Sequence, residues 1–404
     1  MSVIVQKYGG SSLADEEKIK AVAERIKKAR EKECKVAVIV SAMGDTTDEL
    51  IEMADRITSE PDPREMDMLL NTGEQISIAL LSMALQRLGV PAVSMTGSQL
   101  GVATTEKHQN ARIIDIDVER VNRELNENRV VVAAGFQGVT GEKEYTTLGR
   151  GGSDTTAVAL AAKLDARCEI YTDVPGIHTC DPGLVPGARR LEAISYEEMM
   201  EMASLGAEIV HPRAVELASK YEVPLYVGQA LKQDEGTEIG SEGEYLEKSV
   251  ITGMAVSEDD IQVNLRGVEA SEEMPGRIFT LCGRADINID MISQLLNGGS
   301  TMQLSFTADK SDSDSIEQIM DELERELRIS DWWLDEDVCK ISVVGPGMRS
   351  QPGVAADVFN LMSALDIMVK MVTTSEIKIS WLVPAGSEEK ALRAVAEEFD
   401  LTDE

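Results

Sequence analysis

Short runs of β-branched residues alternate with stretches of helical periodicity through residues 1–230. Val36–Val40 is a continuous apolar run, which is typical of a strand covered on both faces. Before it, apolar residues recur at helical spacing from Ile19 to Ala29 and predict an amphipathic helix. This alternation predicts an α/β domain with a largely parallel central sheet and helices on both faces. Because such sheets bind ligands beyond the carboxyl ends of their strands, we expect chemistry in the loops that follow them.

The same pattern places six strands in this region. They are expected at Val3–Val5, Val36–Val40, Pro91–Met95, Val130–Ala134, Cys168–Thr172 and Pro224–Val227. A polar, glycine-rich stretch at residues 232–248 predicts a connector, so we expect the first domain to span residues 1–245.

A weak internal repeat follows the connector, since Pro275-Gly276 recurs as Pro352-Gly353. Each pair precedes a helical stretch, two strands and a charged helix. The expected strands are Ile287–Ile292 with Met302–Phe306, and Ile367–Val372 with Ile377–Trp381; the charged helices are Ile316–Leu327 and Glu388–Phe399. The repeat predicts two similar small α+β modules.

Composition narrows the class of protein. Among 404 residues, 72 are acidic and 39 basic, a net charge of −33, which argues against nucleic acid or an anionic membrane surface as a partner. No stretch approaches the roughly 18 continuous apolar residues of a membrane span, and the first residues lack a signal-peptide pattern. Five cysteines without paired spacing favour reduced thiols. We therefore expect a soluble, cytoplasmic protein.

The first candidate site is the turn Lys7-Tyr8-Gly9-Gly10-Ser11-Ser12, between the first strand and the first helix. Its glycines would let backbone N–H groups approach an anion, and the helix N-terminus adds a favourable dipole. Lys7 would supply a point charge for a phosphate. Ser12 with Asp15 also fits an N-terminal helix cap, so an ordinary capped turn is the alternative.

A second candidate is Thr146–Thr156, which leads into a helix expected at Ala157–Leu164. Its three glycines and its Ser, Asp and Thr residues predict another anion-binding turn. Arg150 could bind a carboxylate with two hydrogen bonds. The alternative is a well-capped tight turn with a surface arginine.

Three further segments carry weaker signals. In the loop at residues 172–183, Asp173 and Asp181 could serve a nucleotide's ribose or its Mg²⁺, although aspartate is also a common turn former. The hydroxyls of Ser41–Thr47 could bind a small polar substrate or cap a helix. Gly73-Glu74 interrupts an apolar helix, which can mark function, but a glutamate on the exposed face is the commoner explanation.

Several common catalytic motifs are missing from the sequence. It contains no Walker-type phosphate loop, no protein-kinase H-R-D or D-F-G set and no G-x-S-x-G elbow. With only His108, His178 and His211, histidine-based catalysis and histidine-ligated metals are disfavoured, and no side-chain metal cluster is expected. His211-Pro212 is expected to open a helix.

Taken together and in this order, six segments resemble the successive signatures of the aspartate kinases. They are Lys7–Ser12, Ser41–Thr47, Gly73-Glu74, Gly149–Thr156, Thr172–Pro182 and His211–Ala214. The two repeats resemble the paired ACT domains of single-function, lysine-sensitive members. The resemblance implies an amino-acid-kinase fold at 1–245 and ferredoxin-like ACT domains at 262–330 and 338–404, with a strand from 249–258 as a candidate addition to the second.

The resemblance also implies an activity. ATP, with Mg²⁺, would phosphorylate the β-carboxylate of L-aspartate to give 4-phospho-L-aspartate, the first step toward lysine, threonine and methionine. By the same resemblance Lys7 and Asp154 are catalytic, Arg150 pairs with a substrate carboxylate and Glu74 with the α-ammonium group. The implied aspartate pocket contains Ser41, Thr47, Glu74, Arg150, Gly151, Gly152 and Ser153, and the implied ATP site contains Lys7, Gly9, Gly10, Ser11, Thr172, Asp173, Thr179, Asp181 and Pro182.

The ACT pair implies inhibition by lysine, threonine or both at interfaces between subunits of a homo-oligomer. The implied effector residues are Glu273, Asn288, Asp290, Gln294, Thr374, Ser375 and Glu376. His178 and Cys180 depart from the Tyr and Ala that are usual in the nucleotide loop, and Met368 stands where the second module usually has Asn. Because methionine cannot replace the hydrogen bonds of an amide, we expect one competent and one altered effector site. Met254 could also start a shorter regulatory chain.

Two other functions stay open. One keeps the fold but uses glutamate or another carboxylate or carbamate as acceptor; such relatives generally lack the ACT pair and the Glu74 motif. The other is a catalytically silent amino-acid sensor, against which the intact Lys7, Arg150 and Asp154 argue.

Overall fold

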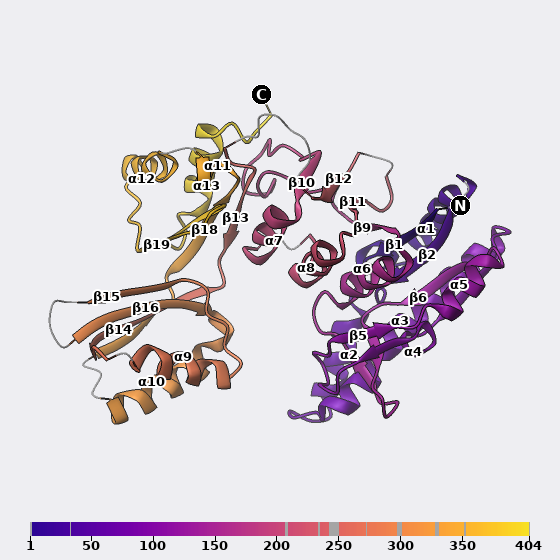
Figure 1. Ribbon diagram of the computed structural model, residues 1–404, viewed down its shortest axis with the longest axis horizontal. Coiled ribbons are helices and arrows are strands. Elements are labelled where there is room, and N and C mark those ends of the chain that lie inside the picture. Colours follow the sequence, from indigo (N-terminus) through magenta and orange to yellow (C-terminus); the bar gives the residue numbers. More distant parts are fainter. Residues whose placement is uncertain are drawn as a thin grey trace. The chain divides into compact units, whose positions relative to one another are not determined.

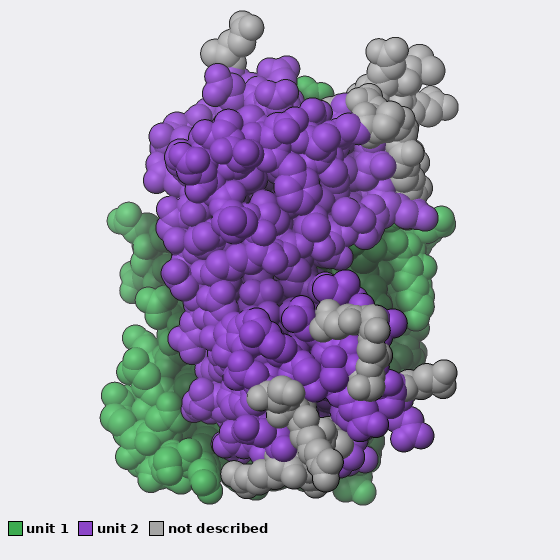
Figure 2. Space-filling view, turned by 90° about the vertical axis from the view of Figure 1, so that its left-hand side faces the viewer, with its two compact units in different colours: residues 1–177, 190–204, 208–244 green, residues 178–189, 205–207, 245–404 purple. Residues whose placement is uncertain are grey.

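The computed structural model describes residues 2–32, 34–206, 209–232, 235–241, 250–271, 273–296, 301–327, 331–350 and 353–403. The chain forms two compact units, coloured separately in Figure 2. The first comprises residues 1–177, 190–204 and 208–244, and the second residues 178–189, 205–207 and 245–404. The predicted connector lies partly, and Pro352 wholly, outside the described residues.

An eight-stranded sheet forms the centre of the first unit, in the order β10-β12-β11-β9-β1-β2-β6-β3 (Figure 1). All neighbouring strands are parallel except β11 and β12. The predicted α/β class is confirmed, and every strand predicted in residues 1–230 overlaps one of these. The strands are β1 (Val3–Tyr8), β2 (Lys35–Val40), β3 (Ala92–Met95), β6 (Val130–Ala134), β9 (Arg167–Thr172), β10 (Ala193–Ser195), β11 (Leu225–Gln229) and β12 (Thr237–Gly240).

Helices cover this sheet. α1 buries the predicted stripe from Ile19 to Ile26, with its last member Ala29 partly buried, and packs with α3. α6 contacts β1, β2 and β9. Asp15, and not Ser12, caps α1 by accepting two backbone N–H groups. The helices are α1 (Glu16–Glu31), α2 (Thr46–Asp55), α3 (Pro63–Arg87), α4 (Gly97–Leu100), α5 (Glu119–Asn126), α6 (Gly152–Leu164), α7 (Tyr196–Ser204) and α8 (Pro212–Tyr221).

A second, smaller sheet in the first unit was not predicted. Its order is β5-β4-β7-β8, with β4 (Val102–Thr104), β5 (Ile113–Ile116), β7 (Gln137–Val139) and β8 (Tyr145–Thr147). α3 runs against β8. By length and composition α3 could cross a membrane, but half of its apolar window is buried inside the protein, as in the core helix of a soluble protein.

The second unit contains two four-stranded antiparallel sheets, so the predicted pair of α+β modules is confirmed. Each sheet has its own apolar core. The strand expected after the connector is β13, which pairs with β18. The strands are β13 (Gly253–Ser257), β14 (Asp260–Glu269), β15 (Ile292–Leu296), β16 (Thr301–Asp309), β17 (Asp331–Asp335), β18 (Val338–Val344), β19 (Met371–Thr374) and β20 (Lys378–Pro384); the helices are α9 (Met274–Arg284), α10 (Ser313–Leu327), α11 (Gly347–Ser350), α12 (Val354–Ala364) and α13 (Glu388–Glu398).

Two predicted strands in this unit are misplaced. Residues 287–291 are irregular and the strand is Ile292–Leu296, so the prediction at Ile287–Ile292 is wrong. Likewise, the strand predicted at Ile367–Val372 begins only at Met371. Ile287 and Met291 are buried from irregular backbone. Apolar side chains therefore mark burial at these positions, whereas backbone bonding to β16 begins at Asp290 and Met291, which bond Thr307.

A buried lysine joins the two sheets of the second unit. Lys340 on β18 lies 3.0 Å from an oxygen of Asp260 at the start of β14 and 2.7 Å from Asp290 just before β15. Burial alone would lower the pKa of Lys340, but the two carboxylates outweigh it and raise that pKa. Asp290, an expected effector residue, is therefore held by a side chain of the other module.

Candidate active site

Lys7 and Asp154 form an ion pair at the carboxyl edge of the large sheet. Lys7 lies near the end of β1 and Asp154 in the first turn of α6, with 2.7 Å between Nζ and Oδ1. The side chains are only 13% and 9% exposed. A Cβ on Gly9 would lie 3.6 Å from the Lys7 ammonium, so the glycine turn passes directly beside this charge. The two residues predicted to be catalytic are thus in contact.

The glycine turn is locked against the loop that follows β2. The Gly44 N–H donates to the Gly10 carbonyl at 3.0 Å, and a Cβ on Gly10 would lie 2.8 Å from the Ala42 oxygen. No side chain fits at Gly10 without moving one loop. The Gly9 N–H donates to the Tyr171 carbonyl at 3.2 Å, so this amide is already engaged, and its phosphate contact stays a prediction.

Glu74 on α3 is buried against the same loop. Gly73 lets the helix approach closely, since a Cβ there would lie 2.9 Å from the Ala42 Cβ. The Glu74 carboxylate is 3% exposed and accepts hydrogen bonds from the Ala42 N–H at 3.2 Å and the Gln137 amide at 3.3 Å. Burial raises the pKa of Glu74 to about 7, although these neutral donors oppose the shift. The exposed-face explanation for Glu74 is therefore wrong.

The Arg150 turn depends on its glycines. Gly149 and Gly151 have φ of +77° and +67°, the left-handed region that favours glycine. A Cβ on Gly151 would lie 2.1 Å from the His211 ring. Ser153 and Asp154 are buried beyond this turn, whereas Arg150 is exposed.

His211 closes the site from the side of α8. Its ring accepts the Arg213 N–H at 3.3 Å and caps α8, which confirms that His211-Pro212 opens a helix. Burial lowers the pKa of His211, which suits a neutral ring that accepts a hydrogen bond. Its backbone N–H lies 3.5 Å from the second oxygen of Asp154.

The predicted nucleotide loop is divided between the two units. Thr172 and Asp173 follow β9 in the first unit, where the Thr172 hydroxyl donates to Asp173 at 3.0 Å. Thr179, Asp181 and Pro182 belong to the second unit. Asp181 accepts the Gly183 N–H at 2.7 Å, and the nucleotide contacts of Asp181 and Pro182 stay predictions.

Thr179 needs a correction. Its side chain is fully buried and its hydroxyl donates to the Leu401 carbonyl at 2.6 Å while accepting the Arg189 N–H at 3.1 Å. A side chain enclosed in this way has no surface for a nucleotide. Thr179 instead ties its loop to the C-terminal residues of the second unit.

Across the described ranges, no group of three or more His, Cys, Asp or Glu side chains is arranged to hold a metal ion. The sequence alone also did not point to Gln137, which donates to Glu74 and to the Asn71 carbonyl. Nor did it point to Asp67, a fully buried carboxylate two turns before Glu74. The signal was present, because residues 67, 71 and 74 fall on one face of an otherwise apolar helix.

Comparisons with known proteins agree with this geometry. Residues 2–229 match the amino acid kinase family and residues 341–399 match an ACT domain family. The chain is 45% identical over 403 residues to aspartokinase 2 of Bacillus subtilis, covering 100% of this chain and 98% of that protein. It is 46% identical over 405 residues to an aspartokinase of Geobacillus stearothermophilus, with the same coverage.

Solved structures show the same likeness. The aspartate kinase from Synechocystis is 40% identical, with a TM-score of 0.56, over 99% of this chain and 70% of that one. E. coli aspartokinase III in complex with aspartate and ADP shares the fold, with 23% identity and a TM-score of 0.82 over 99% and 100% of the two chains. The chain therefore belongs to the aspartate kinase family, with an amino-acid-kinase domain followed by ACT domains.

Proposed function

We propose that this aspartate kinase transfers the γ-phosphoryl group of ATP to the β-carboxylate of L-aspartate through the residues gathered at the carboxyl edge of the large sheet. One observation carries the assignment of roles. The Lys7–Asp154 ion pair lies beside the Gly9-Gly10 turn, and the buried Glu74 carboxylate lies against the loop after β2, which is hydrogen-bonded to that turn. A fixed cation suits a phosphoryl group, and a buried anion suits an ammonium group.

The reaction needs no general base. The β-carboxylate of aspartate is ionised at neutral pH and can attack the γ-phosphorus directly, while the bond from that phosphorus to the β,γ-bridging oxygen breaks. The protein must hold two anions in line and neutralise their charge. In our proposal the Lys7 ammonium and the amides of Gly10 and Ser11 hold the transferring phosphoryl group and neutralise its charge. Asp154 orients the Lys7 ammonium.

Aspartate would be recognised at both of its α-substituents. The ammonium group would pair with Glu74, whose hydrogen bonds come from the neutral Ala42 and Gln137 donors. Arg150 would bind the α-carboxylate with two parallel hydrogen bonds. The rest of the pocket would be Ser41, Thr47, Gly151, Gly152 and Ser153.

ATP would lie beyond β1 and β9, against Gly9, Thr172 and Asp173, with Asp181 and Pro182 as further expected contacts. Mg²⁺ would arrive bound mainly to the phosphates, which is usual when a protein offers one or two carboxylates rather than a cage. Asp154 is the carboxylate placed nearest Lys7. When bound, the ion would withdraw charge from the γ-phosphoryl oxygens.

Regulation would act through the second unit. Aspartokinase III of E. coli has been solved with lysine and aspartate, and we propose that lysine, threonine or both bind here at Asn288, Asp290 and Gln294 of the first module. The remaining expected effector residues are Glu273, Thr374, Ser375 and Glu376. We also keep the three-domain division at 1–245, 262–330 and 338–404 as a proposal.

The edge strand β15 supports a homo-oligomer formed through the ACT domains. Ile292, Leu295 and Leu296 on β15 are 50%, 59% and 65% exposed. A sheet edge with exposed apolar side chains is a natural pairing surface for a second chain. A shorter regulatory chain started at Met254 could pair there as well. We expect the enzyme to be cytoplasmic.

The activity is tested by trapping the acyl phosphate. Purified full-length chain with MgATP and hydroxylamine should form aspartyl hydroxamate from L-aspartate, with kcat/KM at least 100-fold lower for L-glutamate. Glutamate has one more methylene, which would displace its γ-carboxylate from Lys7 when its α-groups are bound. Equal rates would favour the broader carboxylate kinase, and no hydroxamate from either would favour the silent sensor.

The role of Lys7 is tested by Lys7→Ala. We expect kcat to fall at least 100-fold, about 2.7 kcal/mol of barrier, because charge on the transferring phosphoryl group would be left unbalanced. Lys35→Ala is the matched control, since Lys35 lies at the amino end of the neighbouring strand and its ammonium group bonds the Asn126 side chain, away from the proposed site. A loss below tenfold for Lys7→Ala would contradict its assignment.

The effector sites are tested by inhibition with lysine and threonine, singly and together. We expect a single inhibitor without synergy, because Met368 removes the amide of the second site. Met368 is 73% exposed, so Met368→Asn should fold normally and add the second response. Asn288→Ala in the first module should abolish the single response. Full synergy in the unaltered chain would sink this account.

A further inference from the structure

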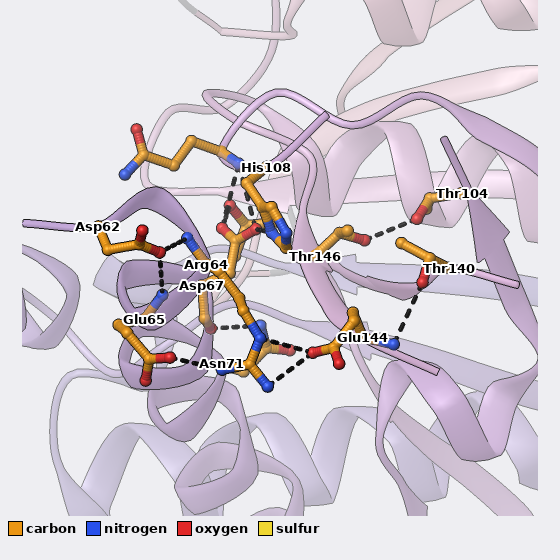
Figure 3. Close-up of polar contacts among 12 residues, drawn as sticks. Asp62, Arg64, Glu65, Asp67, Asn71, Thr104, His108, Thr140, Glu144 and Thr146 are labelled. Carbon is orange, nitrogen blue, oxygen red and sulfur yellow. Dashed lines mark hydrogen bonds and ion pairs between the residues drawn. The ribbon is translucent and has the colours of Figure 1, made fainter. Parts of the chain in front are cut away.

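Asp67 is a buried carboxylate that the proposed mechanism does not use. It lies on α3 with no exposed surface, and its carboxylate accepts hydrogen bonds from three other residues. The His108 ring lies 2.6 Å from Oδ2, the Thr147 hydroxyl 2.6 Å from Oδ1, and the Gln109 N–H 3.2 Å from both oxygens. Figure 3 shows the His108 ring directed at this side chain.

These donors come from two separate segments of the chain. His108 and Gln109 lie between β4 and β5, and Thr147 is the last residue of β8. The segments also bond each other, since the Ala111 N–H donates to the Thr147 carbonyl at 2.9 Å. Burying a carboxyl group is costly unless it is hydrogen-bonded, so the bonds that Asp67 makes to both segments hold them in place.

The clamped segments lead directly to Arg150. Two residues separate Thr147 from Arg150, and a Cβ on Gly149 would lie 3.0 Å from the Gln109 carbonyl. Arg213 bonds the carbonyls of both Leu148 and Ala111, at 2.9 and 2.8 Å, and so also joins the two segments. The start of the Arg150 turn is therefore fixed by Asp67.

The same helix carries Glu74. Asp67, Asn71 and Glu74 share one face of α3, and Asp67 and Glu74 are seven positions apart, an axial rise of about 10 Å. Asn71 bonds the Asp67 carbonyl at 2.6 Å, and Gln137 bonds both the Asn71 carbonyl and Glu74. α3 is thus a rigid spacer between Glu74 and the segment that bears Arg150.

We propose that Asp67 is a positioning residue for aspartate: it holds the Arg150 turn at a fixed distance from Glu74, so that the α-carboxylate and α-ammonium of one substrate molecule are bound together. The inference rests on the proposed roles of Glu74 and Arg150. It adds that the spacing between them is set by a carboxylate that contacts neither substrate nor ATP. Displacements near 1 Å are enough to cost about 100-fold in a positioned site.

Thr147→Val and Thr146→Val form a matched pair of tests. Both threonines are fully or nearly fully buried on β8, but the Thr146 hydroxyl bonds Thr104 at 2.6 Å (Figure 3), whereas the Thr147 hydroxyl donates to Asp67 at 2.6 Å. Thr147→Val should raise the KM for aspartate about tenfold and leave the KM for ATP within twofold, an effect worth about 1.4 kcal/mol. Thr146→Val should change neither by more than twofold.

A second readout separates positioning from general damage. L-Aspartate α-amide lacks the α-carboxylate that Arg150 would bind. Thr147→Val should therefore lower kcat/KM for aspartate about tenfold but leave kcat/KM for the α-amide nearly unchanged. Asp67→Asn keeps the shape and one acceptor oxygen, so it should shift the aspartate-to-amide ratio in the same direction.

The outcomes distinguish this inference from the function beneath it. If the unaltered chain forms no aspartyl phosphate, the proposed function fails and the inference with it. If the unaltered chain is active but Thr147→Val keeps its aspartate KM, or lowers kcat/KM equally for aspartate and its α-amide, the inference alone is overturned. It is overturned too if Thr146→Val gives the same loss as Thr147→Val.

Discussion

The burial of Glu74 against the loop after β2 is the contact on which the rest of the active site depends. Gly73 has no side chain, so α3 can approach Ala42 closely enough for the carboxylate to accept the Ala42 N–H. The loop that takes part in this contact is the one interlocked with the Gly10 turn. One helix thus fixes the loops after two neighbouring strands, and a raised pKa at Glu74 is the energetic consequence of that packing.

Buried charge marks the functional positions in both units. In the first, Lys7 with Asp154 and the carboxylates of α3 lie at or beside the proposed reaction site. In the second, Lys340 binds Asp290, an expected effector residue, from the other module's sheet. Because a buried charge is costly without partners, each of these groups ties together segments that are distant in the sequence. The proposed catalysis and the proposed regulation would both depend on segments held together by a buried charged group.

Much of the fold could be predicted because the aliphatic runs and helical stripes follow their periodicities, as at β2 and α1. The strands of the small sheet were too short to show alternation, and the segment at 287–291 buries Ile287 and Met291 from irregular backbone. The glycine turns at Gly9-Gly10 and Gly149–Gly152 could be located because clustered glycines between a predicted strand and a predicted helix are typical of tight turns. The helical spacing marked Asp67 as sharing a face with Glu74, but the partners of Asp67, Gln137 and Glu74 could not be predicted, because the fold brings them together over 30 to 80 residues.

The central claim is that Glu74 must be ionised to bind the ammonium group of aspartate, and calorimetry tests it most directly. With a pKa of about 7, Glu74 is mostly protonated at pH 6 and mostly ionised at pH 8. Titrating L-aspartate into the full chain in buffers of different ionisation enthalpy should therefore show release of most of a proton at pH 6 and of much less at pH 8. Glu74→Gln should release none at either pH. Binding to the unaltered chain at pH 6 without proton release would contradict the account.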